Sequence, residues 1–220
     1  MVWYLIEFAE DLHHRLTGQD IFFRAVLTTG SFTHYNLQNI ECFFGEALIN
    51  AYLREKEIPS IGLFIDTKCN EHNKYFRTEP FDRELLFVYL NRSLESLNEY
   101  TGGNFPVTDP TVADQSPYAP WQVRFLKDVH EHMRTHPLPQ VRVKFLTAWD
   151  LYKRRYGNML TALEQGNFAL TALAGGQGWA SEQSAMEKDI RHYKRIGSGS
   201  NLSLQLTRNK RRSAPPTSVS

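Results

Sequence analysis

The chain has 220 residues, of which 41% are hydrophobic and 22% are charged, and its formal net charge at pH 7 is +1. This composition is typical of a globular protein with a sizeable core, and the balanced charge gives no general attraction to nucleic acid or to a membrane surface. Two unclustered cysteines, Cys42 and Cys69, set no disulfide framework. The sequence has no apolar run of about 20 residues and no signal-peptide pattern, so we expect a cytoplasmic protein.

The first hundred residues alternate predicted helices and strands. Apolar residues recur with a helical period over residues 3–16, and Gly18 is a plausible end of that helix. The pattern then predicts, in chain order, a strand at 22–28, a less regular strand at 32–37, a helix at 44–55, strands at 61–65 and 84–90, and a helix at 91–100. We therefore expect residues 1–100 to form an α+β layer, a sheet covered by helices.

The remaining residues are predicted to be mainly helical. Residues 101–119 are rich in turn formers and indicate a loop or linker. A helical appendage is expected over 120–196, with helices at 120–135 and 140–165 separated by Pro137 and Pro139, and a charged helix near 182–195. The composition of residues 197–220 predicts a disordered tail.

Residues 22–66 have a recognisable order of short motifs. A strand with Arg24 ends near Gly30, the segment Glu41-Cys42-Phe43-Phe44-Gly45 opens a helix, and an apolar strand follows up to Asp66. This order resembles the middle of a class III nucleotidyl cyclase domain. The stretches CFFGEALINAY, IGLFID and FVYL more narrowly resemble the pyrimidine (uridylate or cytidylate) cyclases of the Pycsar anti-phage systems. The resemblance covers about residues 1–100, and the order and spacing of the motifs carry it.

The resemblance implies a fold and a reaction. The fold would be a ferredoxin-like class III cyclase sheet with covering helices, truncated at its N-terminus. The enzyme, a lyase, would convert UTP to cyclic UMP, or CTP to cyclic CMP, by attack of the ribose 3′-hydroxyl on the α-phosphate with loss of pyrophosphate. The cyclic nucleotide would activate a neighbouring effector in antiviral defence, without contact between the two proteins. The resemblance also implies a homodimer, with no DNA or membrane partner.

The metal ligands of the family have no match in this sequence. Such cyclases hold Mn²⁺ or Mg²⁺ through two aspartates on two strands that precede the first helix found here, and carboxylates suit these hard ions. Asp11, Asp20 and Asp66 lie outside that strand context, so we assign no metal ligand. Two readings follow: a piece of a longer cyclase, which we favour, or a catalytically inactive cyclase-like module that dimerises or binds nucleotide.

The resemblance also points to candidate nucleotide-binding residues. Phe44 and Gly45 at a helix start would allow backbone N–H groups to face a phosphate, although a tight strand-to-helix entry explains the glycine equally. Cys42 matches the family's base-selecting position, or is a structural cysteine. The family's transition-state asparagine and arginine positions hold Ile49 and Leu53, and the adjacent Asn50 is the remaining catalytic candidate.

Other polar residues have simpler interpretations. We expect Arg24 to be structural or interfacial, and a solvated face for the histidine pair 13–14 and for His130, His132 and His136. The basic run 208–212 favours a solubility role over nucleic-acid binding. A third, weaker hypothesis makes residues 120–195 an interaction domain that senses a phage component. Their apolar faces need a packing partner, and the sheet is the default partner.

Overall fold

The computed structural model describes residues 2–109, 111–175 and 178–212, with the backbone alone for 198–212. Its main sheet contains β1 (Arg24–Leu27), β4 (Gly62–Asp66), β6 (Leu85–Val88) and β5 (Thr78–Pro80), in the order β1-β4-β6-β5. β1 runs parallel to β4, whereas β6 is antiparallel to both β4 and β5. The predicted α+β class is therefore confirmed. Among the elements that the sequence pattern had not indicated are β5, the short helix α3 (Thr67–Asn70) and a strand over residues 40–44.

One face of the sheet packs against α1 (Val2–Leu16). Ile6 and Ala9 of this helix share a cluster with Leu63, Ile65 and other residues of the same sheet face. Alternate residues along a strand point to opposite faces, so the buried run of β4 contributes these two residues to this side and Phe64 to the other. The helix predicted over 3–16 is confirmed, and its position on the sheet follows from its apolar stripe.

The opposite face packs against α6 (Ala119–Thr135) and α7 (Pro139–Gln165). Phe64 and Phe87 of the sheet belong to one core cluster with Phe125 of α6 and Trp149 of α7. Also in this cluster is α5 (Val112–Gln115), which lies inside the segment predicted as a loop. Residues of α5, α6 and α7 therefore share one hydrophobic core with the sheet, and this core continues across the segment predicted as a linker.

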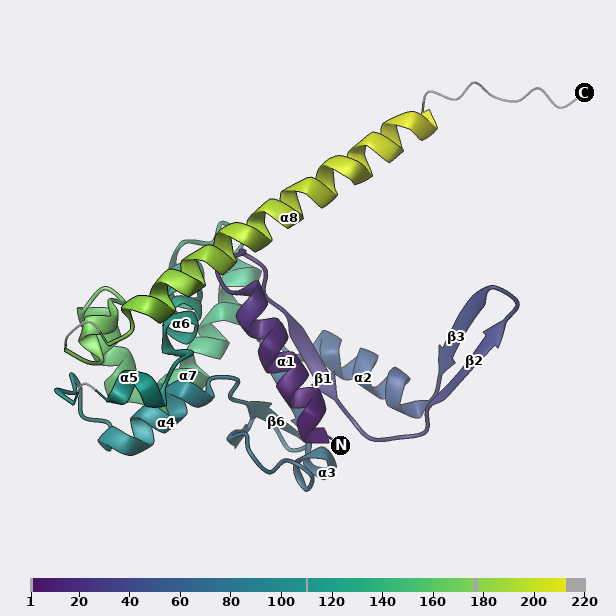
Figure 1. Cartoon of the computed structure of the whole chain (residues 1–220). Coiled ribbons are helices and arrows are strands. Elements are labelled where there is room, and N and C mark those ends of the chain that lie inside the picture. Colours follow the sequence, from purple (N-terminus) through teal and green to yellow (C-terminus); the bar gives the residue numbers. More distant parts are fainter. Residues whose placement is uncertain (1, 110, 176–177, 213–220) are drawn as a thin grey trace, which may run out of the picture.

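The chain between β1 and β4 forms an arm. β2 (Thr33–Leu37) and β3 (Ile40–Phe44) make a separate antiparallel hairpin, followed by α2 (Glu46–Glu57). Figure 1 shows the hairpin projecting from the body of the molecule, beyond the end of α2. All five residues of β2 are exposed, and no residue of α2 is buried. The predicted apolar face of this helix thus covers no core within the described residues.

The remaining helices are α4, η1 and α8. α4 (Arg92–Thr101) ends at Gly102, which has a φ of 59° in the left-handed region and allows the turn that closes the helix. After the short helix η1 (Leu170–Ala172), α8 (Ala180–Arg212) begins against the body and extends away from it (Figure 1).

The predicted disordered tail is wrong for residues 197–212, which are helical. Glycines such as Gly197 and Gly199 weaken a helix without necessarily ending it. Residues 213–220, also part of the predicted tail, lie outside the described residues.

His13 is buried where α1 meets the sheet and α6. Its side chain is 6% exposed, its ring meets that of Phe125 edge-on with centroids 4.2 Å apart, and its Nε2 has no hydrogen-bond partner among the described residues. Burial and the neighbouring His14 lower the pKa of His13 to about 3. His14 is also depressed, to a pKa of about 4, chiefly by burial. The solvated face expected for this pair is therefore wrong for His13.

The buried histidines make the fold sensitive to acid. The unfolded chain takes up protons below a pKa of about 6.5 that folded His13 and His14 do not take up, so stability is lost as the pH falls from there toward 4. For His13 alone, the free energy of unfolding should fall by roughly 1.4 kcal/mol per pH unit in this window. Urea unfolding of the wild type and of His13→Leu between pH 7.5 and 4.5 measures how steeply the free energy of unfolding depends on pH in each protein. Equal slopes for the two proteins would contradict this account.

Candidate functional site

At the start of α2, the backbone at Gly45 packs closely against the backbone at Ser31. Gly45 has a φ of 144°, and a Cβ added there would lie 2.2 Å from the backbone oxygen of Ser31. Ser31 also satisfies the first helical donors: the Glu46 amide donates to its Oγ at 3.3 Å, and the Ala47 amide donates to its carbonyl oxygen at 3.1 Å. The geometry thus accounts for Gly45 by local packing, and these two amides have protein partners.

The other nucleotide-site candidates lie around this entry. Cys42 is half-buried in β3, where its Sγ lies 3.9 Å from the carbonyl oxygen of Ile40. Phe44, the last residue of the same strand, is exposed, and Asn50 lies half-buried in α2. The structure therefore places Cys42, Phe44, Gly45 and Asn50 on one segment. The side chain of Asn50 has no hydrogen-bond partner within the described part of the chain.

Asp66 is fully engaged by neighbouring backbone and side chains. It is the N-cap of α3, with its Oδ1 accepting from the Cys69 amide at 2.6 Å. Its Oδ2 accepts from the Thr28 hydroxyl and from the Thr29 amide, both at 2.9 Å. Burial tends to raise the pKa of this carboxyl, but the hydrogen bonds from Cys69, Thr29 and Thr28 lower it overall. The carboxylate therefore links the end of β1 to the end of β4, a structural role.

Removing this carboxylate should destabilise the fold. Asp66→Ala leaves the Cys69 and Thr29 amides without their acceptor, and loss of an N-cap plus a buried acceptor costs about 2–3 kcal/mol. Urea unfolding measures this loss, with Asp114→Ala as a matched control, because Asp114 is exposed and its carboxylate has no hydrogen-bond or ion-pair partner among the described residues. Stabilisation by Mn²⁺ in the wild type and not in Asp66→Ala would instead indicate a metal ligand.

The remaining candidates are held by protein partners. Arg24 donates from Nε to Glu55 at 2.6 Å and also bonds the backbone oxygen of Ile58, which fastens β1 to the end of α2. His132 Nε2 lies 2.7 Å from Asp20, and its ring stacks on Phe145. His132 therefore lies against an aromatic side chain instead of on the solvated face expected for it.

Two further histidines and one aspartate complete this set. His130 Nε2 lies 3.6 Å from Glu164, and burial lowers the pKa of His130. His136 accepts a hydrogen bond at Nδ1 from the Leu138 amide. Asp11 forms an ion pair with Arg15 at 2.8 Å.

No metal site forms from the described side chains. Across residues 2–109, 111–175 and 178–197, no three His, Cys, Asp or Glu side chains are grouped so that they could hold a metal ion. Mn²⁺ and Mg²⁺ prefer such groups of oxygen ligands, so the described side chains identify no candidate ligands for either ion.

Sequence reasoning missed a buried polar network between α4 and α7. Glu95 accepts from Tyr156 at 2.5 Å and from Arg155 Nε at 3.2 Å. Burial alone would raise the pKa of Glu95, yet the bonds from Arg155 and Tyr156 lower it overall. Arg155 and Tyr156 are about 60 residues from Glu95 in the sequence, so no local sequence pattern could predict these contacts.

Several cavities lie away from the predicted nucleotide-binding residues. One, of about 520 Å³, lies between α1, α4, α5, α6 and α8. Another, of about 450 Å³, is bordered by Arg24, His132 and Phe145, and one of about 340 Å³ by Arg77 and Glu95. Cys42, Phe44, Gly45 and Asn50 line none of these cavities.

Comparisons with known proteins add no relative: no family model, no curated protein and no solved structure matches this chain. Within the described residues, no helix is both long and apolar enough to cross a membrane.

Proposed function

We propose that this chain is part of a pyrimidine nucleotide cyclase that makes cyclic UMP from UTP as a signal in antiviral defence. The supporting observation is the order of elements between residues 24 and 66: strand, hairpin, Gly45, helix, strand, with the two flanking strands parallel neighbours. This is the order on which the resemblance to class III cyclases rests. CTP is the alternative substrate of the same group.

The open edge of the sheet is compatible with further strands. Among the described residues β1 pairs only with β4, so its other edge carries unpaired backbone groups. Exposed apolar residues on α1 (Tyr4, Leu5, Phe8) and on α2 (Leu48, Ile49, Tyr52, Leu53) lie on the helices next to this part of the fold. Strands carrying the metal-binding aspartates would satisfy β1 if they added there. We propose that they come from outside residues 1–220.

One assay separates this proposal from its rival. Residues 1–220 with UTP or CTP and Mn²⁺ should give no cyclic nucleotide, because the two metal-binding aspartates that the resemblance implies have no match in this sequence. A polypeptide extended by its natural upstream reading frame should give cyclic UMP, detected by mass spectrometry. Product from residues 1–220 alone would overturn the metal argument, and an inactive extended polypeptide would overturn the cyclase proposal.

A catalytically inactive cyclase-like dimerisation module is the second candidate, and the missing carboxylate cluster favours it. Both candidate functions require the chain to form a homodimer. The hairpin supports this, since Leu37 and Ile40 flank its turn at 55% and 67% exposure, and Phe43 and Phe44 are about half exposed. An isolated two-stranded hairpin is marginally stable in water, and a second copy would cover these side chains.

The hairpin therefore offers a test of dimerisation. The double variant Leu37→Ser/Ile40→Ser should lower the molar mass in multi-angle light scattering from dimer to monomer, because it removes apolar contact area without disturbing the core. Leu138→Ser is the control, since Leu138 is 50% exposed at the turn between α6 and α7. A wild type that stays monomeric at micromolar concentration, or a double variant that stays dimeric, would contradict this interface.

A further inference from the structure

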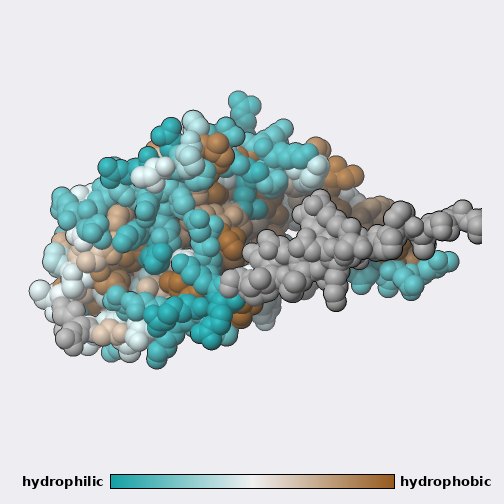
Figure 2. All heavy atoms as spheres, turned by 90° about the horizontal axis from the view of Figure 1, so that it is seen from above, coloured by the Kyte–Doolittle hydropathy of each residue, from teal (hydrophilic) through white to brown (hydrophobic). Residues whose placement is uncertain are grey.

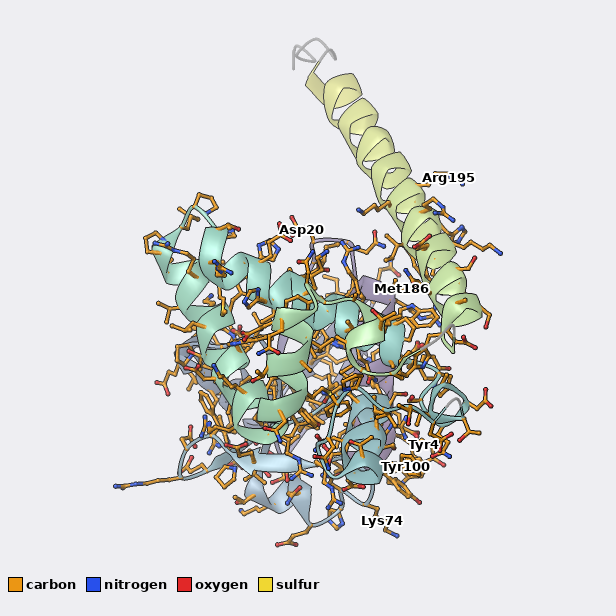
Figure 3. All side chains as sticks on the ribbon, turned by 90° about the vertical axis from the view of Figure 1, so that its left-hand side faces the viewer. Tyr4, Asp20, Lys74, Tyr100, Met186 and Arg195 are labelled. Carbon is orange, nitrogen blue, oxygen red and sulfur yellow. The ribbon has the colours of Figure 1, made fainter. Side chains whose placement is uncertain are left out.

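A cavity of about 450 Å³ lies at the corner where α6 turns into α7. The chain that connects α1 to β1 forms one side of it, and the first two turns of α7 form another. Figure 3 shows Asp20, which belongs to the connecting chain, at the same end of the body as the turn between α6 and α7. A cavity of this size is large enough for a small organic molecule.

Aromatic and aliphatic side chains form much of the cavity wall. Phe22 meets Phe145 edge-on with ring centroids 4.8 Å apart, and His132 stacks on Phe145 at the same centroid distance. Val141 lies one helical turn before Phe145 and lines the same cavity. Phe22 and Val141 are only half-buried, so part of this wall is accessible from outside. The wall therefore suits the apolar part of a ligand.

Both carboxylates that line the cavity are engaged by protein groups. Asp20 lies 2.7 Å from His132 Nε2, and its side chain is 77% exposed to solvent. Glu55 accepts from Arg24 Nε at 2.6 Å, and Arg24 also donates to the Ile58 carbonyl oxygen. A cationic ligand would therefore have to compete with the protein's own donors for either carboxylate.

Two donors of the same cavity have no acceptor among the described residues. Lys144 forms no ion pair or hydrogen bond with any of them. His136 accepts from the Leu138 amide at Nδ1, so the proton of the neutral ring is on Nε2, which has no hydrogen-bond partner there. Lys144 and His136 are both half-buried. An anionic group that binds to these two donors would break no existing pair.

The unpaired donors and the apolar wall together select the ligand. A bare ion such as phosphate would leave the aromatic wall uncovered, whereas an uncharged apolar molecule would leave the Lys144 ammonium group unpaired. We propose that the cavity binds a small organic carboxylate with an apolar body. Its carboxylate accepts charge-assisted hydrogen bonds from Lys144 and His136, and its apolar body lies against Phe22 and Phe145. This inference is independent of the proposed cyclase activity.

Saturation-transfer NMR of the full chain with 4-phenylbutyrate, at constant ionic strength, tests the proposal. We expect saturable binding. Lys144→Gln and His136→Asn should each weaken it about tenfold, since each removes one charge-assisted hydrogen bond. The asparagine oxygen can still accept from the Leu138 amide, so the turn keeps its hydrogen bond in this variant. The matched control is Lys153→Gln, which should bind as the wild type does, because Lys153 is an exposed lysine of α7 that lines none of this cavity.

A neutral analogue separates the role of the donors from that of the wall. The amide 4-phenylbutyramide should bind about tenfold more weakly than the acid. Equal affinity for acid and amide would overturn the proposal, because the wall alone would then account for binding. Displacement of the acid by an equal concentration of inorganic phosphate would indicate a simple anion site instead. Equal weakening in Lys144→Gln and Lys153→Gln would indicate attraction to overall charge, and absence of saturable binding at millimolar concentration would exclude the site.

Discussion

The fold depends on the burial of β4 and β6 on both faces. Leu63 and Ile65 lie against α1, while Phe64 and Phe87, which are register partners, lie against α6 and α7. Each large apolar side chain that is fully buried contributes about 1.5–3 kcal/mol relative to an exposed one. A sheet with two apolar faces needs two covering layers, so helices from both ends of the chain must meet on these strands.

The same constraint explains the contrast between the body and the arm. The arm, consisting of β2, β3 and α2, carries apolar residues. It is joined to the body through the Arg24–Glu55 and Arg54–Glu84 ion pairs, without buried helix residues. On the face seen in Figure 2, apolar residues lie in several places within a largely hydrophilic surface. The body therefore has a core of its own, whereas apolar side chains of the arm such as Leu37, Ile40 and Phe44 are exposed.

The sequence predicted the elements whose periodicity is strong and local. The helices at α1, α6 and α7 and the apolar strands β4 and β6 were predicted close to their observed positions. β5 contains Pro80 and only three residues, so no alternation revealed it. At Gly45 the sequence pattern supported either a ligand-facing glycine or a packing glycine. A side chain would not fit there because the backbone of Ser31 lies too close. Ser31 is far enough away in the sequence that no local pattern reveals this contact.

Long-range polar pairs fix the positions of α4 and α7 relative to the rest of the core. Glu95 is buried between α4 and α7 and is paired with Arg155 and Tyr156, while Glu10 of α1 is paired with Arg92 at the start of α4. A buried carboxylate that loses its partner destabilises a protein by about 3–5 kcal/mol, so each pair disfavours arrangements in which the helices slide or separate. Apolar burial alone would tolerate several such arrangements. The two pairs connect α1 to α4 and α4 to α7, so the layers on opposite faces of the sheet are fixed relative to each other through α4.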